Sequence, residues 1–189
     1  MILVTGATGT VGREVVAQLL AAGEKVRALT RNPSRAQLDE QVELAAGDLS
    51  QPETLAKAAE GVESVFSLAT GPQLGTQETN LAQAAKEAGA RHIVKLSGLR
   101  PAGEARSGIS SWHQASERAI QNIGIAWTFV QPGAFMSNAL YWRDSIKAQG
   151  KVFSNYGDGK VAYIHPRDIA AVAVRALTEP GHWPRSVER

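Results

Sequence analysis

The stretch "VTGATGTVGREVV", residues 4–16, decides the fold of this chain. Gly6, Gly9 and Gly12 stand between the apolar run "ILVT" (2–5) and a helical pattern. A dinucleotide pyrophosphate must approach bare backbone at a helix N-terminus, where free N–H groups and the helix dipole favour negative charge. The first glycine allows a tight turn, the second lets the phosphate come close, and the third lets the helix pack on the strand. This spacing predicts a cofactor cradle, with a merely structural turn as the alternative; the expected contacts are Gly6, Thr8, Gly9, Thr10, Val11 and Gly12.

Short apolar runs alternate with helical patterns along most of the chain. Several runs are nearly continuous in apolar residues, as expected for strands that are covered on both faces. Strand, helix, strand repeated in this way predicts a Rossmann-type α/β fold, a doubly wound parallel sheet with helices on both faces. We expect one NAD(P)-binding domain over residues 1–189, with substrate-side segments at 132–165. The expected strands are 2–5, 25–30, 42–46, 64–69, 91–97 and 126–131.

Composition and charge narrow the classes of partner. The chain of 189 residues is 43% hydrophobic and 20% charged, which is typical of a globular protein. Its 20 basic and 18 acidic residues are interspersed, so nothing resembles a nucleic-acid footprint. The absence of cysteine excludes disulfides and thiolate ligands, and we expect no metal site. No run is long enough to span a bilayer and no leader is recognised, so we expect a cytoplasmic protein without membrane contact.

The end of the second expected strand favours NADP(H) over NAD(H). In "ALTRNPSR" (28–35), Arg31 stands where an NAD-selective site presents an acidic residue to the ribose hydroxyls. A guanidinium there suits a 2′-phosphate, and Arg35 and Arg13 add to the positive field. The alternative is that these are solvated loop arginines.

Two further strand ends carry expected cofactor contacts. Asp48 and Leu49 follow the third strand, where the carboxylate can accept from the adenine amino group and the leucine can pack near the ring. The alternative is that Asp48 initiates the loop and the following helix. Ala69 and Thr70 end the fourth strand and are expected along the middle of the cofactor.

Together these motifs resemble the atypical short-chain dehydrogenase/reductases, specifically their NmrA-like branch, which includes NADPH-dependent quinone reductases. The resemblance covers nearly the whole chain. It is carried by "VTGATGTVGREVV", "RALTRNP", "GDLSQPETL", "NLAQAAKEAGARHIVKLSG", "HQASERAIQNIGIAWTFVQPGAFMSN" and "YIHPRDIAAVAVRAL".

The resemblance also implies candidate catalytic residues. In catalytic members of the larger superfamily, a Ser after the fifth strand works with a Tyr and, four residues on, a Lys. Ser97 matches the Ser, whereas His113 and Glu117 stand at the Tyr and Lys positions. Ser97 is a candidate catalytic hydroxyl or a strand-end cap. His113 is a candidate proton donor or a pocket-lining residue. Glu117 is expected at the helix surface, paired with a nearby Arg, with orientation of His113 as the alternative.

The absence of the Tyr–Lys pair favours reduction of conjugated acceptors over reduction of simple ketones. Reduction of a simple ketone creates a strongly basic alkoxide that needs a positioned proton donor. Hydride addition to a quinone instead gives a delocalised phenolate that demands little acid catalysis. The sequence therefore predicts an oxidoreductase that transfers hydride from NADPH to a quinone-like or conjugated small molecule. The alternative is a non-catalytic NADP(H)-sensing regulator that acts through a protein partner.

Aromatic residues are concentrated in the second half of the chain. Of the four Trp, three Tyr and four Phe residues, only Phe66 precedes residue 112. We expect an apolar acceptor pocket at the nicotinamide end, with core packing as the alternative. After "LTEPGH" the C-terminal substrate region is short or truncated, so we expect an open pocket or one completed in a homo-oligomer. The expected substrate contacts are Trp112, Phe135, Met136 and Tyr141.

Overall fold

The central feature of the computed structural model, which describes residues 1–99, 108–154 and 157–182, is one parallel sheet. Its six strands lie in the order β3-β2-β1-β4-β5-β6, and every neighbouring pair is parallel. The strands are β1 (Ile2–Val4), β2 (Val26–Thr30), β3 (Glu43–Ala46), β4 (Ser64–Ser67), β5 (His92–Leu96) and β6 (Ala126–Val130). The strand order reverses between β1 and β4, which is the switch point where open α/β sheets bind ligands.

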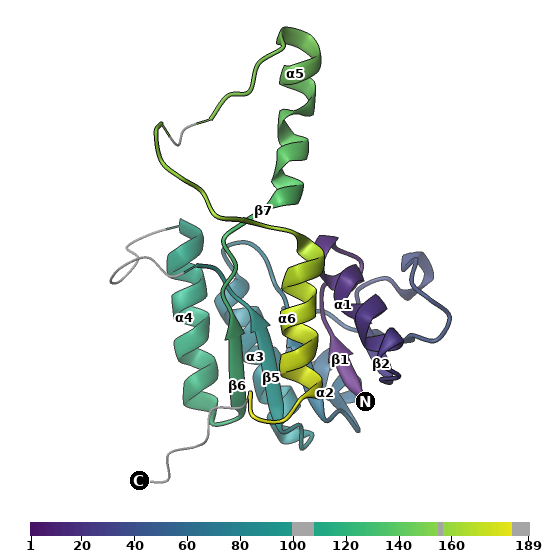
Figure 1. Ribbon diagram of the computed structural model, residues 1–189. Helices are drawn as coiled ribbons and strands as arrows, with labels where there is room; N and C mark the ends of the chain where they lie inside the picture. Colours follow the sequence, from purple (N-terminus) through teal and green to yellow (C-terminus); the bar gives the residue numbers. More distant parts are fainter. Residues whose placement is uncertain (100–107, 155–156, 183–189) are drawn as a thin grey trace.

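Helices cover both faces of the sheet (Figure 1), which confirms the Rossmann-type prediction. One face carries α1 (Thr10–Ala21) and α6 (Pro166–Thr178), and the other carries α2 (Leu55–Ala59), α3 (Leu74–Glu87) and α4 (Gly108–Ile123). Short 3-10 turns lie at η1 (Pro33–Arg35) and η2 (Pro52–Thr54).

Alternation along the strands divides the core into two clusters. Ile2 and Val4 pack toward α1 and α6, whereas Leu3, between them, packs toward α2 and α3. The same division holds in β5, where Val94 faces the first cluster and Ile93 the second. β1, β4 and β5 are buried at every position, which agrees with the nearly continuous apolar runs of the sequence, whereas the edge strand β3 is largely exposed.

The helical sequence pattern "SQPETLAKAAEG", residues 50–61, forms a helix much shorter than the pattern itself. The pattern over 50–61 gives only the turn η2 followed by α2. The hydroxyl of Ser50 does not cap it: Ser50 Oγ accepts instead from Nε2 of Gln77, at 2.9 Å. The segment thus serves partly to hold the loop after β3 against α3.

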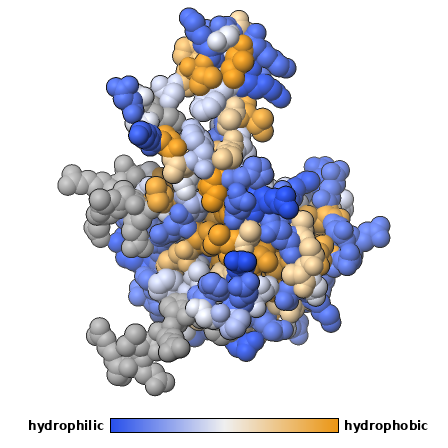
Figure 2. All heavy atoms as spheres, in the orientation of Figure 1, coloured by the Kyte–Doolittle hydropathy of each residue, from blue (hydrophilic) through white to orange (hydrophobic). Residues whose placement is uncertain are grey.

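The segment after β6 forms an arm that stands away from the sheet (Figure 1). It comprises β7 (Ala134–Phe135), η3 (Met136–Trp142) and α5 (Arg143–Gln149), and β7 pairs in parallel with β8 (Tyr163–Ile164). Figure 2 shows apolar atoms on the surface of this arm. Large apolar side chains that are exposed there are Met136, Leu140, Tyr141, Ile146, Val152 and Phe153.

Throughout the described ranges, each helix is too short or too polar to cross a lipid bilayer.

Candidate functional site

The turn after β1 can be made only with glycine at two positions. Gly6 has φ of +64°, in the left-handed region. A Cβ at Gly12 would lie 2.0 Å from the carbonyl oxygen of Gly6, a contact with backbone that cannot be relieved by a rotamer. The N–H of Gly9 donates to that same carbonyl at 2.9 Å, and Gly9 then begins α1. The result is a tight turn that ends at a helix N-terminus, as an anion site requires.

Thr5 ties this turn to the neighbouring strand. Its buried Oγ1 donates to the carbonyl of Leu68 at 3.0 Å and accepts from the N–H of Leu68 at 2.7 Å. This pair of hydrogen bonds therefore holds together the segments that follow β1 and β4 at the switch point of the sheet. Sequence reasoning missed this role, although a hydroxyl directly before the first glycine was a visible signal.

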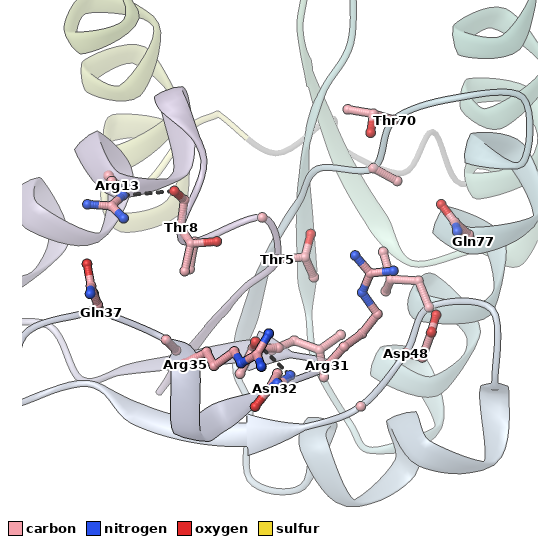
Figure 3. A pocket seen from close by; sticks show the side chains of 18 residues that line it. Thr5, Thr8, Arg13, Arg31, Asn32, Arg35, Gln37, Asp48, Thr70 and Gln77 are labelled. Carbon is pink, nitrogen blue, oxygen red and sulfur yellow. Dashed lines mark hydrogen bonds between the residues drawn. The ribbon is translucent and has the colours of Figure 1, made fainter.

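A cleft of about 510 Å³ opens over this switch point (Figure 3). Most of the predicted cofactor residues line it: Gly6, Thr8, Arg31, Asp48, Leu49, Ala69 and Thr70. Gly9 and Thr10 lie at the exposed start of α1, whereas Val11 and Gly12 are buried beneath it. The structure also brings in lining residues that were not predicted, among them Thr5, Asn32, Gln37 and Gln77.

Three arginines bring positive charge to the cleft. Arg13 on α1 donates from Nε to the carbonyl of Thr8 at 2.8 Å and so braces the glycine turn. Arg31 and Arg35, from the loop after β2, line the opposite side, and Figure 3 shows the Arg31 side chain projecting into the cleft. Cations on both sides suit a ligand that carries phosphate at more than one place.

The loop after β3 is fixed by hydrogen bonds rather than by packing alone. Asp48 Oδ1 accepts from the N–H of Ser50 at 2.8 Å, so one carboxylate oxygen organises its own loop. Asn80 on α3 donates from Nδ2 to the carbonyl of Leu49 at 2.9 Å. These bonds hold Asp48 and Leu49 at the wall of the cleft.

A cluster of buried polar side chains lies between β5 and the helices α3 and α4. Lys95 Nζ lies 2.6 Å from Glu78 Oε2, and both side chains are fully buried. Glu78 also accepts from the hydroxyls of Ser67 at 3.2 Å and Ser116 at 2.5 Å. Burial raises the pKa of Glu78, while Lys95 and the two hydroxyls act in the opposite direction. The sequence already held a signal for this cluster, since a lysine inside the continuous apolar strand "HIVKL" needs a partner.

The predicted residue His113 belongs to this cluster. Its Nδ1 lies 3.0 Å from Nζ of Lys95. Burial, and next the positive charge of Lys95, lower the pKa of His113 to about 4, although Glu117 acts in the opposite direction. His113 is therefore a neutral imidazole near pH 7.

Ser97 and Glu117 meet beside it. Ser97 Oγ donates to Glu117 Oε1 at 2.6 Å, and Gln131 Nε2 donates to the same oxygen at 2.9 Å. Glu117 is 3% exposed, so the expectation of a helix-surface residue is wrong. The hydroxyl proton of Ser97 points to Glu117, which leaves its oxygen only as an acceptor for another group.

The predicted substrate contacts come from three elements, α4, β7 and η3, and differ in how far they are exposed. Met136 and Tyr141 are 49% and 84% exposed on the arm. Phe135 packs against the core cluster beneath α1 and α6, and Trp112 is half-buried on α4. Aromatic composition identified the segment but did not reveal how far the arm stands from the sheet.

The doubly wound sheet and its glycine-lined switch-point cleft define a dinucleotide-binding α/β protein. The chain belongs to the NAD(P)H-binding family, whose sequence model matches residues 6–180. This confirms the resemblance to the atypical short-chain dehydrogenase/reductases.

Three similar proteins set the family context. The chain is 44% identical over 185 residues to an NAD(P)H azoreductase from Xenophilus azovorans, covering 96% of this chain and 65% of that protein. It is 44% identical over 188 residues to a (4-alkanoyl-5-oxo-2,5-dihydrofuran-3-yl)methyl phosphate reductase from Streptomyces griseus subsp. griseus, covering 98% and 66%. A crystal structure of an NADPH-dependent quinone oxidoreductase from Escherichia coli, complexed with NADPH, has 30% identity and a TM-score of 0.86, covering 97% of this chain and 66% of that one. The chain thus spans about two thirds of the length of these relatives.

Proposed function

We propose that this chain forms the NADP(H)-binding part of an oxidoreductase that reduces a conjugated small molecule, such as a quinone. The observation that carries the proposal is the cleft itself, with a glycine turn on one side and Arg31 on the other. Three relatives bear the names azoreductase, furanone-type phosphate reductase and quinone oxidoreductase, which supports a reductase of conjugated acceptors.

The choice of NADPH over NADH rests on the loop after β2. Arg31 and Arg35 both line the cleft there, and a planar guanidinium binds phosphate oxygens in pairs. An acidic residue, which would bind the ribose hydroxyls of NADH and repel a 2′-phosphate, does not follow β2 directly. The adenine lies, on this proposal, between these residues and Asp48 and Leu49, with Ala69 and Thr70 farther along the cofactor.

The chemistry follows from which proton donors the chain provides. When bound, NADPH supplies a hydride from its nicotinamide ring. His113 is neutral and Ser97 already donates to Glu117, so neither resembles the Tyr–Lys pair that protonates an alkoxide. Conjugated acceptors delocalise the charge that hydride addition creates, and they need a weaker donor. We therefore assign His113 to donate or orient and Ser97 to accept a hydrogen bond near the acceptor.

We propose that four side chains contact the acceptor. Trp112, Phe135, Met136 and Tyr141 offer flat or polarisable surfaces suited to a conjugated ring. The exposure of Met136 and Tyr141 on the arm supports an acceptor pocket that is open or is completed by a second copy of the protein.

One titration and one assay test the proposal. Fluorescence titration with NADPH and NADH should show tighter binding of NADPH. Absorbance at the nicotinamide band should then report NADPH oxidation with a panel of quinones and azo dyes.

Arg31→Ala should weaken NADPH binding about 10-fold and change NADH binding less than about twofold, since one charged hydrogen-bonding partner is lost. Arg143→Ala, which removes the same charge from the exposed arm, is the matched control. Equal affinity for both nucleotides contradicts the role of Arg31. NADPH binding without turnover on any acceptor contradicts the reductase and favours the non-catalytic NADP(H)-sensing regulator.

A further inference from the structure

Lys95 makes more contacts than a structural ion pair requires. Its Nζ lies 2.6 Å from Glu78 Oε2, 3.3 Å from the carbonyl oxygen of Leu96 and 3.0 Å from Nδ1 of His113. A lysine ammonium has three donors and no acceptor. Each of these neighbours must therefore accept, and the three contacts use the whole donor set.

This donor count fixes the protonation of His113. Since Nδ1 accepts from Lys95, the single proton of the neutral ring lies on Nε2. The Nε2 edge faces the loop that leaves β5: a Cβ at Gly98 would lie 3.7 Å from Nε2 and 3.3 Å from Cδ2. The ring also lines a small cavity of about 10 Å³ with Gly98, Gln114 and Gln131. The edge that carries the proton thus lies toward the carboxyl edge of the sheet, and the other edge lies against the buried ammonium.

We propose that Lys95 is a positioning residue and proton reserve for His113. It holds the imidazole as a neutral Nε2–H donor, and it replaces that proton when a reduced acceptor takes it. The inference rests on the proposed reductase function, because the acceptor supplies the oxygen or nitrogen anion that needs the proton.

The proton transfer balances without another reactant. The anionic atom of the acceptor, formed by hydride addition, bonds to the Nε2 proton as the Nε2–H bond breaks. An Nζ–H bond of Lys95 breaks at the same time and its proton bonds to Nδ1, so the ring stays neutral and Lys95 becomes an amine. A proton from water at Nε2, with return of the Nδ1 proton to Lys95, restores the starting state.

The relay explains how a neutral imidazole can donate a proton at this site. A neutral imidazole alone is a very weak acid, since it would have to become an anion. Because Lys95 gives a proton to Nδ1 as Nε2 releases one, the ring donates without becoming an anion. The buried carboxylate of Glu78, fixed by Ser67 and Ser116, keeps the ammonium at the ring and compensates its charge.

The first test reads the tautomer without any cofactor. The chain has four histidines, and ¹⁵N-histidine spectra of the full chain, assigned with His113→Asn, should show His113 with its proton on Nε2 at pH 7. The charged groups that face the ring are Lys95 on β5 and Glu117 on α4, with Glu78 on α3 behind Lys95. In Lys95→Met/Glu78→Gln, which removes both buried charges together, the tautomer preference should disappear and the titration midpoint of His113 should move up by about one pH unit. Glu78→Gln alone keeps the ammonium and should keep the Nε2–H tautomer. If the wild-type spectra show the His113 proton on Nδ1, the proposal is overturned. This measurement does not depend on whether any variant folds.

The second test measures whether Lys95 and His113 act in one proton path. Lys95→Met/Glu78→Gln should lower kcat for NADPH oxidation by an acceptor about 100-fold, with the KM for NADPH changed less than about twofold. His113→Asn should lose a similar factor, and the triple variant should lose no more, because both changes interrupt one proton path. Additive losses, or an unchanged kcat, overturn the relay. A wild type that oxidises no NADPH overturns the proposed function and the proton transfer with it, whereas the spectra still decide whether Lys95 sets the tautomer.

Discussion

The two halves of the carboxyl edge of the sheet are built by different means. Around β1 the cleft depends on main-chain geometry, because Gly6 and Gly12 shape the turn from which α1 begins. Around β5 the site depends on side chains from separate elements, with Glu78 on α3, Lys95 on β5 and His113 on α4.

On the proposed function, this difference separates the region that binds the cofactor from the region that supplies protons. A glycine turn recognises any diphosphate, because every nucleotide cofactor of this type carries one. A buried network of titratable side chains can instead be altered residue by residue, which changes how protons are supplied without changing the cofactor.

Filling the glycine turn gives the largest expected effect. Gly12→Ala puts a Cβ 2.0 Å from the carbonyl oxygen of Gly6, so α1 and the turn must separate. We expect the free energy of unfolding to fall by about 3 kcal/mol and the Kd for NADPH to rise roughly 100-fold. Urea unfolding and fluorescence titration measure the two effects.

The matched control is a helix-start glycine outside the cleft. A Cβ at Gly75, the second residue of α3, meets nothing within 4 Å. Gly75→Ala should leave the Kd unchanged and raise stability by up to about 1 kcal/mol. Equal behaviour of the two variants would mean that the turn does not form the cofactor cradle.

The two halves also differ in how far the sequence predicts them. The positions of Gly6, Gly12 and Arg31 near the turns that follow β1 and β2 could be predicted from sequence. The residues of a turn between two adjacent elements are neighbours in the sequence, so no distant contact has to be known. The strands were predicted for a related reason, since burial on both faces leaves an apolar run that needs no distant partner.

The buried cluster could not be predicted from sequence, because it is formed by contacts between residues that are far apart in the chain. Ser116 and Glu78 are 38 positions apart, and Lys95 and His113 are 18 apart. His113 was identified only through the family resemblance, and Glu117 was assigned to the surface because a helix pattern does not show what packs above it. The arm illustrates the same limit: Tyr141 was a plausible pocket residue by composition, and it is 84% exposed.

Acid should destabilise the β5 half but leave the glycine turn unaffected. Folded His113 has a pKa of about 4, whereas an unfolded histidine has a pKa of about 6.5. Between these values the unfolded chain binds more protons, so the free energy of unfolding falls as the pH is lowered from 6.5 toward 4. At pH 5 this loss is about 2 kcal/mol for His113.

A variant comparison isolates this histidine from His92, whose pKa burial also lowers to about 4. Between pH 7 and pH 5, His113→Asn should lose about 2 kcal/mol less stability than the wild type in urea unfolding. An identical loss in both proteins would show that His113 is not held neutral by its surroundings.

The smallest expected effect tests whether Glu78 depends on each of its donors. Ser116→Ala removes a hydroxyl that donates at 2.5 Å to the fully buried Glu78, and no water replaces it without opening the cluster. The lost charged hydrogen bond should cost about 2 kcal/mol, reduced by about 0.5 kcal/mol through the better helix propensity of alanine. Ser111→Ala, in the same helix, removes only an exposed bond to the carbonyl of Gly108 and gains the same propensity, so it should be neutral or slightly stabilising. If the two substitutions change the free energy of unfolding equally, the ion pair does not depend on its hydroxyl donors, and Lys95 is positioned by Glu78 alone.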